Sequence, residues 1–201
     1  MKYISATEAA REMSSPTMVE DETLYRRFLN GEKTALRELI ERHANNLTFY
    51  INGYTHNISE AEDLMLEAFA RIVAKSPHFD ERGFKPYLYK IGRNLALRFI
   101  SKNRGQNSFS FEDLDCEVGS AELLEDVLQT KERDRILHIS MTQIQTDYRE
   151  VLYLLYFENL SYKEAAAIMN KSEKQIANLV YRGKLALRPI LEKEGLSNAQ
   201  Y

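Results

Sequence analysis

The segment 161–187 carries polar side chains of the types that bind nucleic acid. Lys, Arg, Gln and Asn side chains can hydrogen-bond to base edges in the major groove of DNA, or to its phosphates. Six polar side chains recur along one side of a helix expected after Ser172: Lys174, Gln175, Asn178, Tyr181, Arg182 and Lys184. This pattern favours a helix that reads DNA. A helical hairpin with an ordinary solvated polar face is the alternative.

Two short helices around a tight turn would position this face. Ser161 with Glu164, and Ser172 with Gln175, have the spacing of a capping box, in which the serine hydroxyl accepts a hydrogen bond from an amide at the helix start. The predicted turn lies at Asn170. Apolar residues recur at helical spacing on the inner faces: Ala165, Ala166, Ile168, Met169, Ile176, Leu179, Val180, Gly183 and Leu187. Together these features predict a helix-turn-helix whose second helix is the recognition helix.

A second group of residues combines aromatic rings with cations. Residues 76–86 are predicted to form a loop bounded by Pro77 and Pro86, and residues 87–101 to form a helix. Its inner stripe consists of Leu88, Ile91, Leu95 and Phe99, and its other sides carry Tyr87, Lys90, Arg93, Asn94 and Arg98. Rings stack on bases and cations follow the backbone, so the pattern suits single-stranded nucleic acid. A basic helix surface beside core tyrosines explains it equally well.

A helix predicted over 59–75 carries acidic residues outward. Ser59 with Glu62 suggests a capping box at its start. The residues expected to face inward are Ala61, Leu64, Ala68, Phe69, Ile72 and Val73, and the outward acids are Glu60, Glu62, Asp63 and Glu67. Paired carboxylates can serve acid–base catalysis or bind a metal, but both uses need convergent partners. We interpret this face as a docking surface for a basic partner.

The histidines do not supply such partners. They are dispersed at His43, His56, His78 and His138, without a second histidine or cysteine at metal-ligand spacing. His43 lies on the apolar stripe of a helix predicted before Tyr54, after a break at Asn30 and Gly31, and is expected to be buried and hydrogen-bonded. We therefore expect no catalytic residue, no metal and no cofactor.

Composition favours an all-α, soluble protein. Of 201 residues 44% are hydrophobic and 28% charged, only 8 are Gly and 4 are Pro, and alternating strand patterns are missing. A lone cysteine, Cys116, fits a reducing cytoplasm. The chain shows no apolar run of membrane-spanning length and no signal-peptide pattern, so we expect a cytoplasmic protein without membrane insertion.

The distribution of charge matters more than the net value of -3. Residues 81–105 carry seven cations against one acid, residues 106–130 carry seven acids and no cation, and residues 171–188 carry five cations against one acid. Two basic patches separated by an acidic strip are compatible with nucleic-acid binding despite the net negative charge. Helices are also predicted over 121–129, 131–144 and 147–157, the last capped by Asp147, and the chain is expected to fray after Pro189.

Two blocks of the sequence resemble a known family. The stretches AEDLMLEAFARIVAK (61–75) and FKPYLYKIGRNLALRFISKNR (84–104) resemble conserved region 2 of the sigma-70 class. The stretch YREVLYLLYFENLSYKEAAAIMN (148–170), with the recognition helix after it, resembles region 4. With a short acidic linker between them, the chain is similar to the extracytoplasmic-function sigma factors of bacteria over about residues 22–191.

The resemblance implies two small helical domains joined by a flexible acidic linker. Their implied extents are an N-terminal extension at 1–20, region 2 at 21–103, the linker at 104–120, region 4 at 121–192 and a C-terminal tail at 193–201. It also implies a non-enzymatic function: to bind core RNA polymerase, recognise the promoter minus-35 and minus-10 elements and promote DNA melting. The implied partners are the beta-prime clamp helices and beta flap of the polymerase, promoter DNA both as duplex and as a melted non-template strand, and an anti-sigma factor.

The resemblance also assigns residues. Asp63, Leu66, Glu67 and Phe69 match the polymerase-docking helix. The minus-10 set is Phe79, Lys85, Tyr87, Lys90, Arg93, Asn94 and Arg98, and the minus-35 set is the six residues of the recognition helix. Leu66 replaces the usual Gln, and Tyr87 replaces the usual Trp but keeps a stacking ring. Ala177 and Leu179 replace common cations, which puts the promoter sequence in doubt.

Two other functions also fit parts of the pattern. A freestanding helix-turn-helix repressor or activator would bind duplex DNA without polymerase, and its other domain would mediate dimerisation or bind a ligand. An all-helical hydrolase that used Glu62, Asp63, Glu67 and a histidine would need a metal, and the dispersed histidines make it the least favoured reading.

Overall fold

A computed structural model of the chain describes residues 19–79, 82–106 and 132–194, and every regular element in these ranges is helical. The elements are α2 (Asp21–Leu29), α3 (Lys33–Thr55), α4 (Ile58–Lys75), α5 (Phe84–Gln106), α7 (Glu132–Thr142), α8 (Thr146–Leu152), the π-helical turn η1 (Tyr153–Phe157), α9 (Tyr162–Met169) and α10 (Glu173–Lys193). The predicted all-α class is therefore confirmed. The predicted helix at 121–129, Cys116 and most of both termini and of the acidic linker lie outside the described residues.

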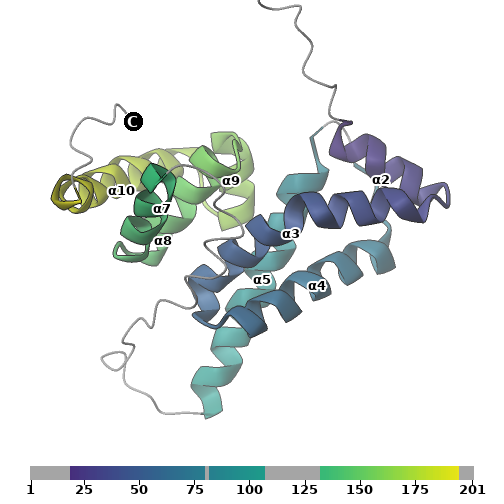
Figure 1. Cartoon of the computed structure of the whole chain (residues 1–201), viewed down its shortest axis with the longest axis horizontal. Coiled ribbons are helices and arrows are strands. Elements are labelled where there is room, and N and C mark those ends of the chain that lie inside the picture. Colours follow the sequence, from purple (N-terminus) through teal and green to yellow (C-terminus); the bar gives the residue numbers. More distant parts are fainter. Residues whose placement is uncertain (1–18, 80–81, 107–131, 195–201) are drawn as a thin grey trace, which may run out of the picture.

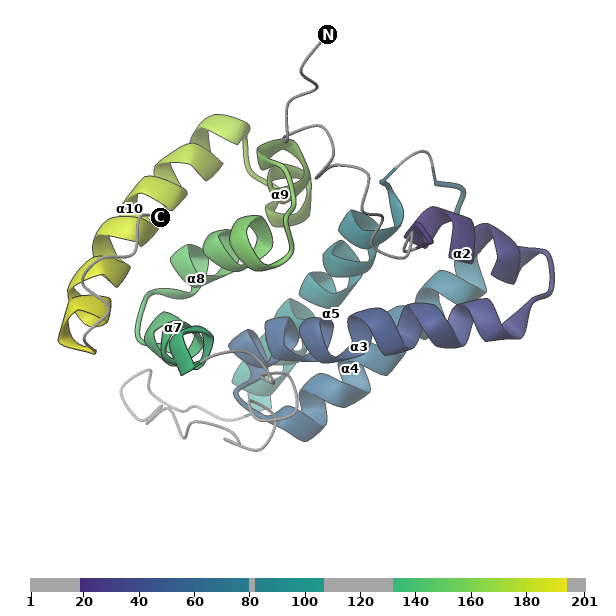
Figure 2. The same cartoon turned by 45° about the horizontal axis from the view of Figure 1, so that its top comes forward.

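The helices form two groups that lie side by side (Figures 1 and 2). The N-terminal bundle consists of α2, α3, α4 and α5, in which α3 packs on the other three helices. The C-terminal unit consists of α7, α8, η1, α9 and α10, in which α10 contacts α7, α8 and α9. The two groups meet where α8 contacts α3 and where α9 contacts α5.

Local turn chemistry sets several helix ends. Gly31 has φ of +99° in the turn between α2 and α3, so the predicted break at this point is confirmed. The predicted cap of α4 at Ser59 is wrong. The cap is Asn57, whose Oδ1 accepts a hydrogen bond from the Glu60 amide at 3.2 Å.

The predicted boundaries of α5 are also wrong. The helix begins at Phe84 because this buried residue's amide donates to Glu22 Oε1 at 3.0 Å, a cap supplied by α2. Pro86 therefore lies in the first turn, where an amide hydrogen is not needed. The helix continues to Gln106, so the predicted linker at 104–120 starts inside it.

The predicted helix at 147–157 begins at Thr146, and Asp147 does not cap it. Gln145 occupies the cap position, and Asp147 Oδ2 instead lies 3.3 Å from Lys171 Nζ. The prediction that the chain frays after Pro189 is wrong as well. The apolar stripe continues past this proline with Leu191, which is buried, so α10 extends to Lys193.

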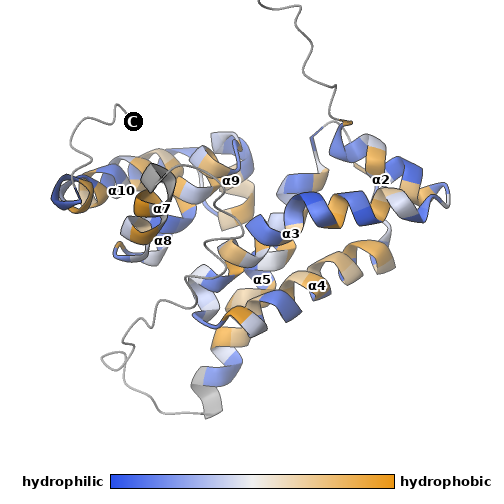
Figure 3. Ribbon diagram, in the orientation of Figure 1, coloured by the Kyte–Doolittle hydropathy of each residue, from blue (hydrophilic) through white to orange (hydrophobic). Residues whose placement is uncertain are grey.

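Apolar residues line the contacts between helices, and Figure 3 shows them as stripes along each helix. The largest fully buried side chains include Tyr25, Phe84 and Tyr89 in the N-terminal bundle and Leu154 and Ile168 in the C-terminal unit. No described helix is long and apolar enough to span a membrane. In the described ranges, no three His, Cys, Asp or Glu residues gather as they would to hold a metal ion.

Candidate nucleic-acid interfaces

Both predicted capping boxes of the helix-turn-helix are present. The Ser161 amide donates to Glu164 Oε2 at 2.6 Å, and the Ser172 amide donates to Gln175 Oε1 at 2.8 Å. Asn170 adopts the left-handed conformation with φ of +55°, which ends α9 and turns the chain into α10. This geometry confirms the predicted helix-turn-helix.

The outer face of α10 is polar and exposed. Lys174, Gln175, Asn178, Tyr181 and Arg182 are all exposed, and the Tyr181 side chain is 66% exposed. Lys184 differs, because its Nζ lies 4.8 Å from the centre of the Tyr156 ring and the residue is half-buried. The opposite face packs closely on α8: a Cβ added to Gly183 would lie 3.2 Å from Leu152 Cδ1.

The predicted single-strand set on α5 divides into two parts. Lys90, Asn94 and Arg98 are exposed and follow one another at intervals of four residues, so they form a polar row along one side of the helix. Tyr87 and Phe79 are half-buried, and their ring centres are 5.3 Å apart. Phe79 also packs against Tyr25 at 5.0 Å, so these two rings belong to an aromatic cluster beside the row.

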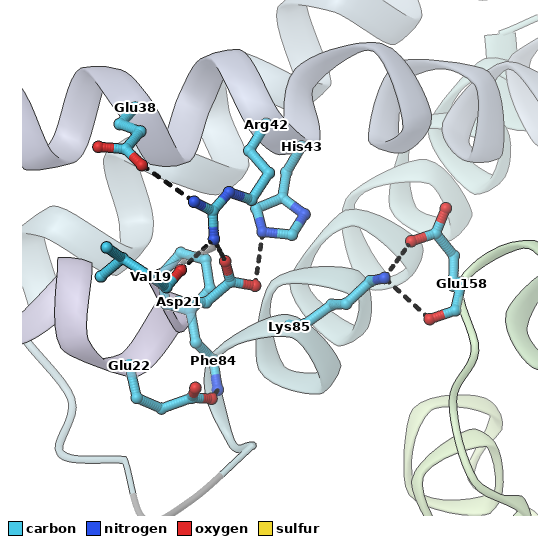
Figure 4. A network of polar contacts seen from close by, with 9 residues as sticks. All are labelled: Val19, Asp21, Glu22, Glu38, Arg42, His43, Phe84, Lys85 and Glu158. Atoms are coloured by element: carbon cyan, nitrogen blue, oxygen red, sulfur yellow. Dashed lines mark hydrogen bonds and ion pairs between the residues drawn. The ribbon is translucent and has the colours of Figure 1, made fainter. Parts of the chain in front are cut away.

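Lys85 and Arg93 contact the C-terminal unit instead of the solvent. Arg93 Nε donates to Glu150 Oε1 at 2.7 Å. Lys85 Nζ lies 2.7 Å from Glu158 Oε2 and donates to the Glu158 backbone carbonyl at 2.8 Å, as Figure 4 shows. Burial disfavours the charge of Arg93, but the Glu150 carboxylate outweighs this effect and raises the pKa of Arg93.

Sequence reasoning missed both carboxylates. Glu150 and Glu158 are only 3% and 2% exposed. Glu150 lies within α8, and Glu158 comes directly after η1, so both belong to the same largely apolar segment. An acid inside an apolar stretch is a signal that it faces a buried cation, because an unpaired buried charge is costly. Tyr50 also donates its hydroxyl to Glu150 Oε1 at 2.7 Å. Burial and the nearby Glu150 charge hold the pKa of Tyr50 well above its ordinary value, so the hydroxyl stays protonated as a donor.

The predicted docking residues on α4 lie in two environments. Asp63 and Glu67 are exposed, and Leu66 is 55% exposed. Glu67 Oε1 forms an ion pair with Arg71 Nη2 at 2.6 Å. Phe69 is buried at 3% exposure and can support this surface only from inside.

The prediction that Val73 faces inward is wrong, because this residue is 36% exposed. The exposed parts of Leu66 and Val73 give α4 an apolar component among its acids. A surface that combines carboxylates with exposed aliphatic groups suits a basic, amphipathic partner.

His43 has the structural role that was predicted for it. The residue is buried at 4% exposure, and its Nε2 lies 2.7 Å from Asp21 Oδ2. Arg42 Nη1 lies 2.7 Å from the other oxygen of the same carboxylate, Asp21 Oδ1. This cluster joins α2 to α3 inside the N-terminal bundle.

Comparisons with known proteins agree with the two-part architecture. Residues 39–106 match the family model of sigma-70 region 2, and residues 137–187 match that of sigma-70 region 4. The ECF RNA polymerase sigma factor SigM of Bacillus subtilis is 28% identical over 160 residues, which are 78% of this chain and 94% of that protein. The RNA polymerase sigma-H factor of Pseudomonas aeruginosa is 26% identical over 190 residues, which are 88% and 98% of the two chains.

Solved structures give the same fold. The structure of CnrH in complex with the cytosolic domain of CnrY matches with a TM-score of 0.58 at 21% identity, over 87% of this chain and 98% of that one. The two sigma-70 models together cover more than half of the 201 residues, in the order region 2 then region 4. The chain therefore belongs to the extracytoplasmic-function sigma factors of the sigma-70 family, the non-enzymatic subunits that bring RNA polymerase to promoters and start transcription.

Proposed function

We propose that this sigma factor divides promoter recognition between two separate exposed polar faces, one on α5 and one on α10. The observation that carries the proposal is that a single chain presents both faces on helices whose opposite sides pack into the apolar core. The face on α10 would read the minus-35 element as duplex. The face on α5, with the aromatic cluster beside it, would hold the melted non-template strand of the minus-10 element.

The chemistry of α10 supports the duplex role. Asn178 and Arg182 are exposed one helical turn apart near the start of the helix, and amide and guanidinium groups bind adenine and guanine edges in the major groove. Lys174 lies near the helix N-terminus, where a phosphate is favoured. Gln175 already uses its carbonyl oxygen in the capping box, so its amide nitrogen is the group left to contact DNA.

The chemistry of α5 supports the single-strand role. Lys90, Asn94 and Arg98 follow one another by about 6 Å along the helix axis, so an extended strand could contact all three. The Tyr87 ring lies at the start of this row and offers a stacking surface in the position that the family resemblance gives to Trp. A combined grip of cations and a ring is sequence-tolerant, and Asn94 would add the base contact.

The acidic and aliphatic face of α4 would dock on the beta-prime clamp helices. Asp63 and Glu67 supply charge, and Leu66 supplies apolar area at the centre of the same face. The second polymerase contact would be between the C-terminal unit and the beta flap. Each contact can be weak, because one contact raises the effective concentration of the next. The protein would act in the bacterial cytoplasm, where transcription takes place.

We assign residues 21–106 to region 2, because α5 continues to Gln106, 121–192 to region 4 and the acidic segment 107–120 to a linker that enters the polymerase channel. An anti-sigma factor is the regulator that we infer. The matched structures support this step, because CnrH was solved with CnrY, and the sigma factor RpoE of Bartonella quintana with the anti-sigma factor NepR. Such a partner would cover the α4 face or one of the two basic faces.

Run-off transcription with core RNA polymerase and a library of promoter fragments tests the proposal. We expect specific start sites only when the protein is present. Asp63→Arg should abolish them and should prevent capture of the core enzyme, because it reverses a charge on the docking face. Glu192→Arg makes the same charge change on an exposed residue of α10, outside the proposed faces, and should leave initiation intact. Equal behaviour of the two variants would refute the docking assignment.

The DNA faces are tested with the assembled holoenzyme. Arg182→Ala should weaken binding to duplex fragments that contain the minus-35 element, whereas Arg188→Ala, with a 76% exposed side chain farther along α10, should not. Asn94→Ala should leave duplex binding unchanged and slow promoter melting, read by permanganate reactivity of unpaired thymines. A protein that shifts duplex DNA alone and never initiates with core enzyme would instead be a freestanding regulator.

A further inference from the structure

The contact between the N-terminal bundle and the C-terminal unit uses two cations that the family resemblance assigns to minus-10 DNA. Lys85 and Arg93 belong to the minus-10 set, yet each is paired with a carboxylate of the C-terminal unit at 2.7 Å. The carboxylate side chains are almost completely buried, with 0% exposure for Glu158 and 2% for Glu150. We call these four residues, Lys85, Arg93, Glu150 and Glu158, the latch.

Further contacts surround the latch and hold the two groups of helices together. Tyr153 donates its hydroxyl to the Asn46 carbonyl at 2.9 Å, and Arg149 Nη2 donates to the Gly53 carbonyl. The Tyr153 ring also stacks on Phe49, with ring centres 5.6 Å apart. The latch is therefore part of a closed interface between α3, α5, α8 and η1, not an isolated surface pair.

The carboxylates of the latch offer Lys85 and Arg93 the same chemistry as a DNA phosphate. Guanidinium and ammonium groups bind carboxylate and phosphate oxygens with similar charge-assisted hydrogen bonds. In the closed arrangement both cations point toward buried glutamates of the C-terminal unit, and their side chains are only 26% (Lys85) and 13% (Arg93) exposed, so few of their hydrogens can reach a phosphate. We propose that the described arrangement is an autoinhibited state, in which Glu150 and Glu158 occupy two cations of the minus-10 set, Lys85 and Arg93, and must leave before melted DNA can engage those cations. This inference rests on the proposed function of α5.

The incomplete hydrogen bonding of the two carboxylates favours an interface that can open. Oε2 of Glu150 and Oε1 of Glu158 are buried without a hydrogen-bond partner among the described residues. Burying a charge is costly unless its remaining lone pairs are also satisfied, so this interface is weaker than its short ion pairs suggest. Opening would return both glutamates to water.

The polar row gives a strand a place to bind before the latch opens. Lys90, Asn94 and Arg98 are exposed in the closed arrangement. Arg93 is next to Asn94 in the helix, so a strand that first binds this row gains Arg93 only after the C-terminal unit moves away. The same movement frees Lys85, which lies on another side of α5. Binding of single-stranded DNA and opening of the interface are then coupled, and each must favour the other by the same factor.

Opening can be measured on the full-length protein with two spin labels. Ser59, in the first turn of α4, and Gln143, directly after α7, are exposed and belong to the two groups of helices, so Ser59→Cys and Gln143→Cys provide labelling sites after Cys116→Ser. Pulsed electron paramagnetic resonance should give a short, narrow distance distribution for the closed protein. Opening should give a longer and broader one.

The test variant combines Glu150→Gln with Glu158→Gln, which keeps shape and the ability to accept hydrogen bonds. The matched control combines Glu192→Gln with Glu194→Gln, which makes the same change of net charge at exposed positions. We expect the test variant to open, and to bind a short fluorescent single-stranded oligonucleotide of mixed sequence about tenfold more tightly than the control does. Equal affinities with an unchanged short distance would refute the latch.

A second test adds increasing amounts of the oligonucleotide to spin-labelled protein in which the four latch residues are unchanged, so it does not depend on the folding of a latch variant. Adding the oligonucleotide to the spin-labelled protein should convert the short distance to the long one. A protein that becomes saturated with oligonucleotide and keeps the short distance contradicts the proposal. Run-off transcription in parallel separates the two hypotheses: if the latch opens as expected but no protein initiates with core polymerase, the proposed function fails and the latch does not.

Discussion

Two clusters of charged side chains in this protein differ in how completely their carboxylates are paired; Figure 4 draws the first, around Asp21, and the Lys85–Glu158 pair of the second, the latch. Inside the N-terminal bundle, Arg42 binds one oxygen of Asp21 and His43 binds the other, each at 2.7 Å. Arg42 also donates to the Val19 carbonyl at 2.6 Å and to Glu38 Oε1 at 3.0 Å. In the latch, Oε2 of Glu150 and both side-chain oxygens of Glu158 lack a hydrogen bond from the described residues, and Oε2 of Glu158 has only its ion pair with Lys85.

The difference separates a permanent joint from an openable one. The Asp21 cluster joins two consecutive helices of one bundle, α2 and α3. The latch joins segments 57 and 73 residues apart in the sequence, and its cations belong to a proposed DNA-binding face. Complete pairing suits the first role, whereas incomplete pairing keeps the free energy of opening low.

The pKa of Asp21 agrees with this assignment. Burial alone would raise it, but the hydrogen bonds and charges of His43 and Arg42 outweigh burial and lower the pKa below the ordinary 3.8. A lowered pKa in the folded state means that the charged carboxylate stabilises the fold above pH 3.8, and that this contribution is lost as the pH falls below that value.

The largest effect is expected from Asp21→Asn. The change removes a charge that pairs with both Arg42 and His43, and the free energy of unfolding should fall by about 3 kcal/mol, measured by urea denaturation. The spin-label distance between Ser59→Cys and Gln143→Cys should not change, because the cluster lies within one group of helices.

Glu38→Gln is the matched control for Asp21→Asn. It removes another carboxylate partner of the same Arg42, but the Glu38 side chain is 49% exposed. An exposed pair contributes little, so the free energy of unfolding should change by less than about 0.5 kcal/mol. If Glu38→Gln costs as much as Asp21→Asn, burial and complete pairing do not distinguish the Asp21 cluster.

A smaller effect is expected from Tyr50→Phe, which weakens the latch. It removes the hydroxyl that donates to Glu150 Oε1, a bond worth about 1 kcal/mol, and this should raise the ratio of open to closed protein about fivefold. The spin-label distance distribution measures that ratio. Tyr25→Phe is the control, because its buried hydroxyl has no hydrogen-bond partner in the described structure and lies in the aromatic cluster with Phe79. An equal response to both changes would mean that Tyr50 does not hold the latch closed.

Local sequence signals were sufficient for the helix-turn-helix but not for the latch. The capping boxes at Ser161 and Ser172 depend on residues three positions apart, so the sequence contains the whole interaction. The start of α5 could not be predicted in this way, because its amide is capped by Glu22, 62 residues earlier. Pro86 looked like a boundary only because that distant cap was not visible.

Helix periodicity predicted which polar residues of α4 and α10 face outward, but it could not place every site residue. Phe69 matched the docking helix by family resemblance, yet its position on the helix makes it part of the core. Lys85 and Arg93 matched the single-strand face by the same reasoning, and tertiary contacts turn them toward Glu158 and Glu150. The sequence predicts residue types on a face, whereas the packing of two groups of helices decides which of them are accessible.

The smallest effect expected from opening the latch is on His56, which ends α3 in the left-handed conformation. Its protein surroundings displace part of the water around the ring and, together with the positive charge of Arg149 in α8, lower the pKa of His56 below the ordinary 6.5. Opening removes Arg149 from this turn, so the pKa should rise toward 6.5 in the variant with Glu150→Gln and Glu158→Gln. Protonation of His56 must then favour the open form as the pH falls below 6.5.

Nuclear magnetic resonance titration of the His56 ring measures this shift. The control variant with Glu192→Gln and Glu194→Gln makes the same change of net charge and should leave the pKa of His56 where it is in the closed protein. The shift should be small, because His56 is exposed and water screens the charge of Arg149. A test variant that is open by spin-label distance but keeps the lowered pKa would show that Arg149 still contacts this turn, and that the two groups of helices separate around Arg149 as a hinge.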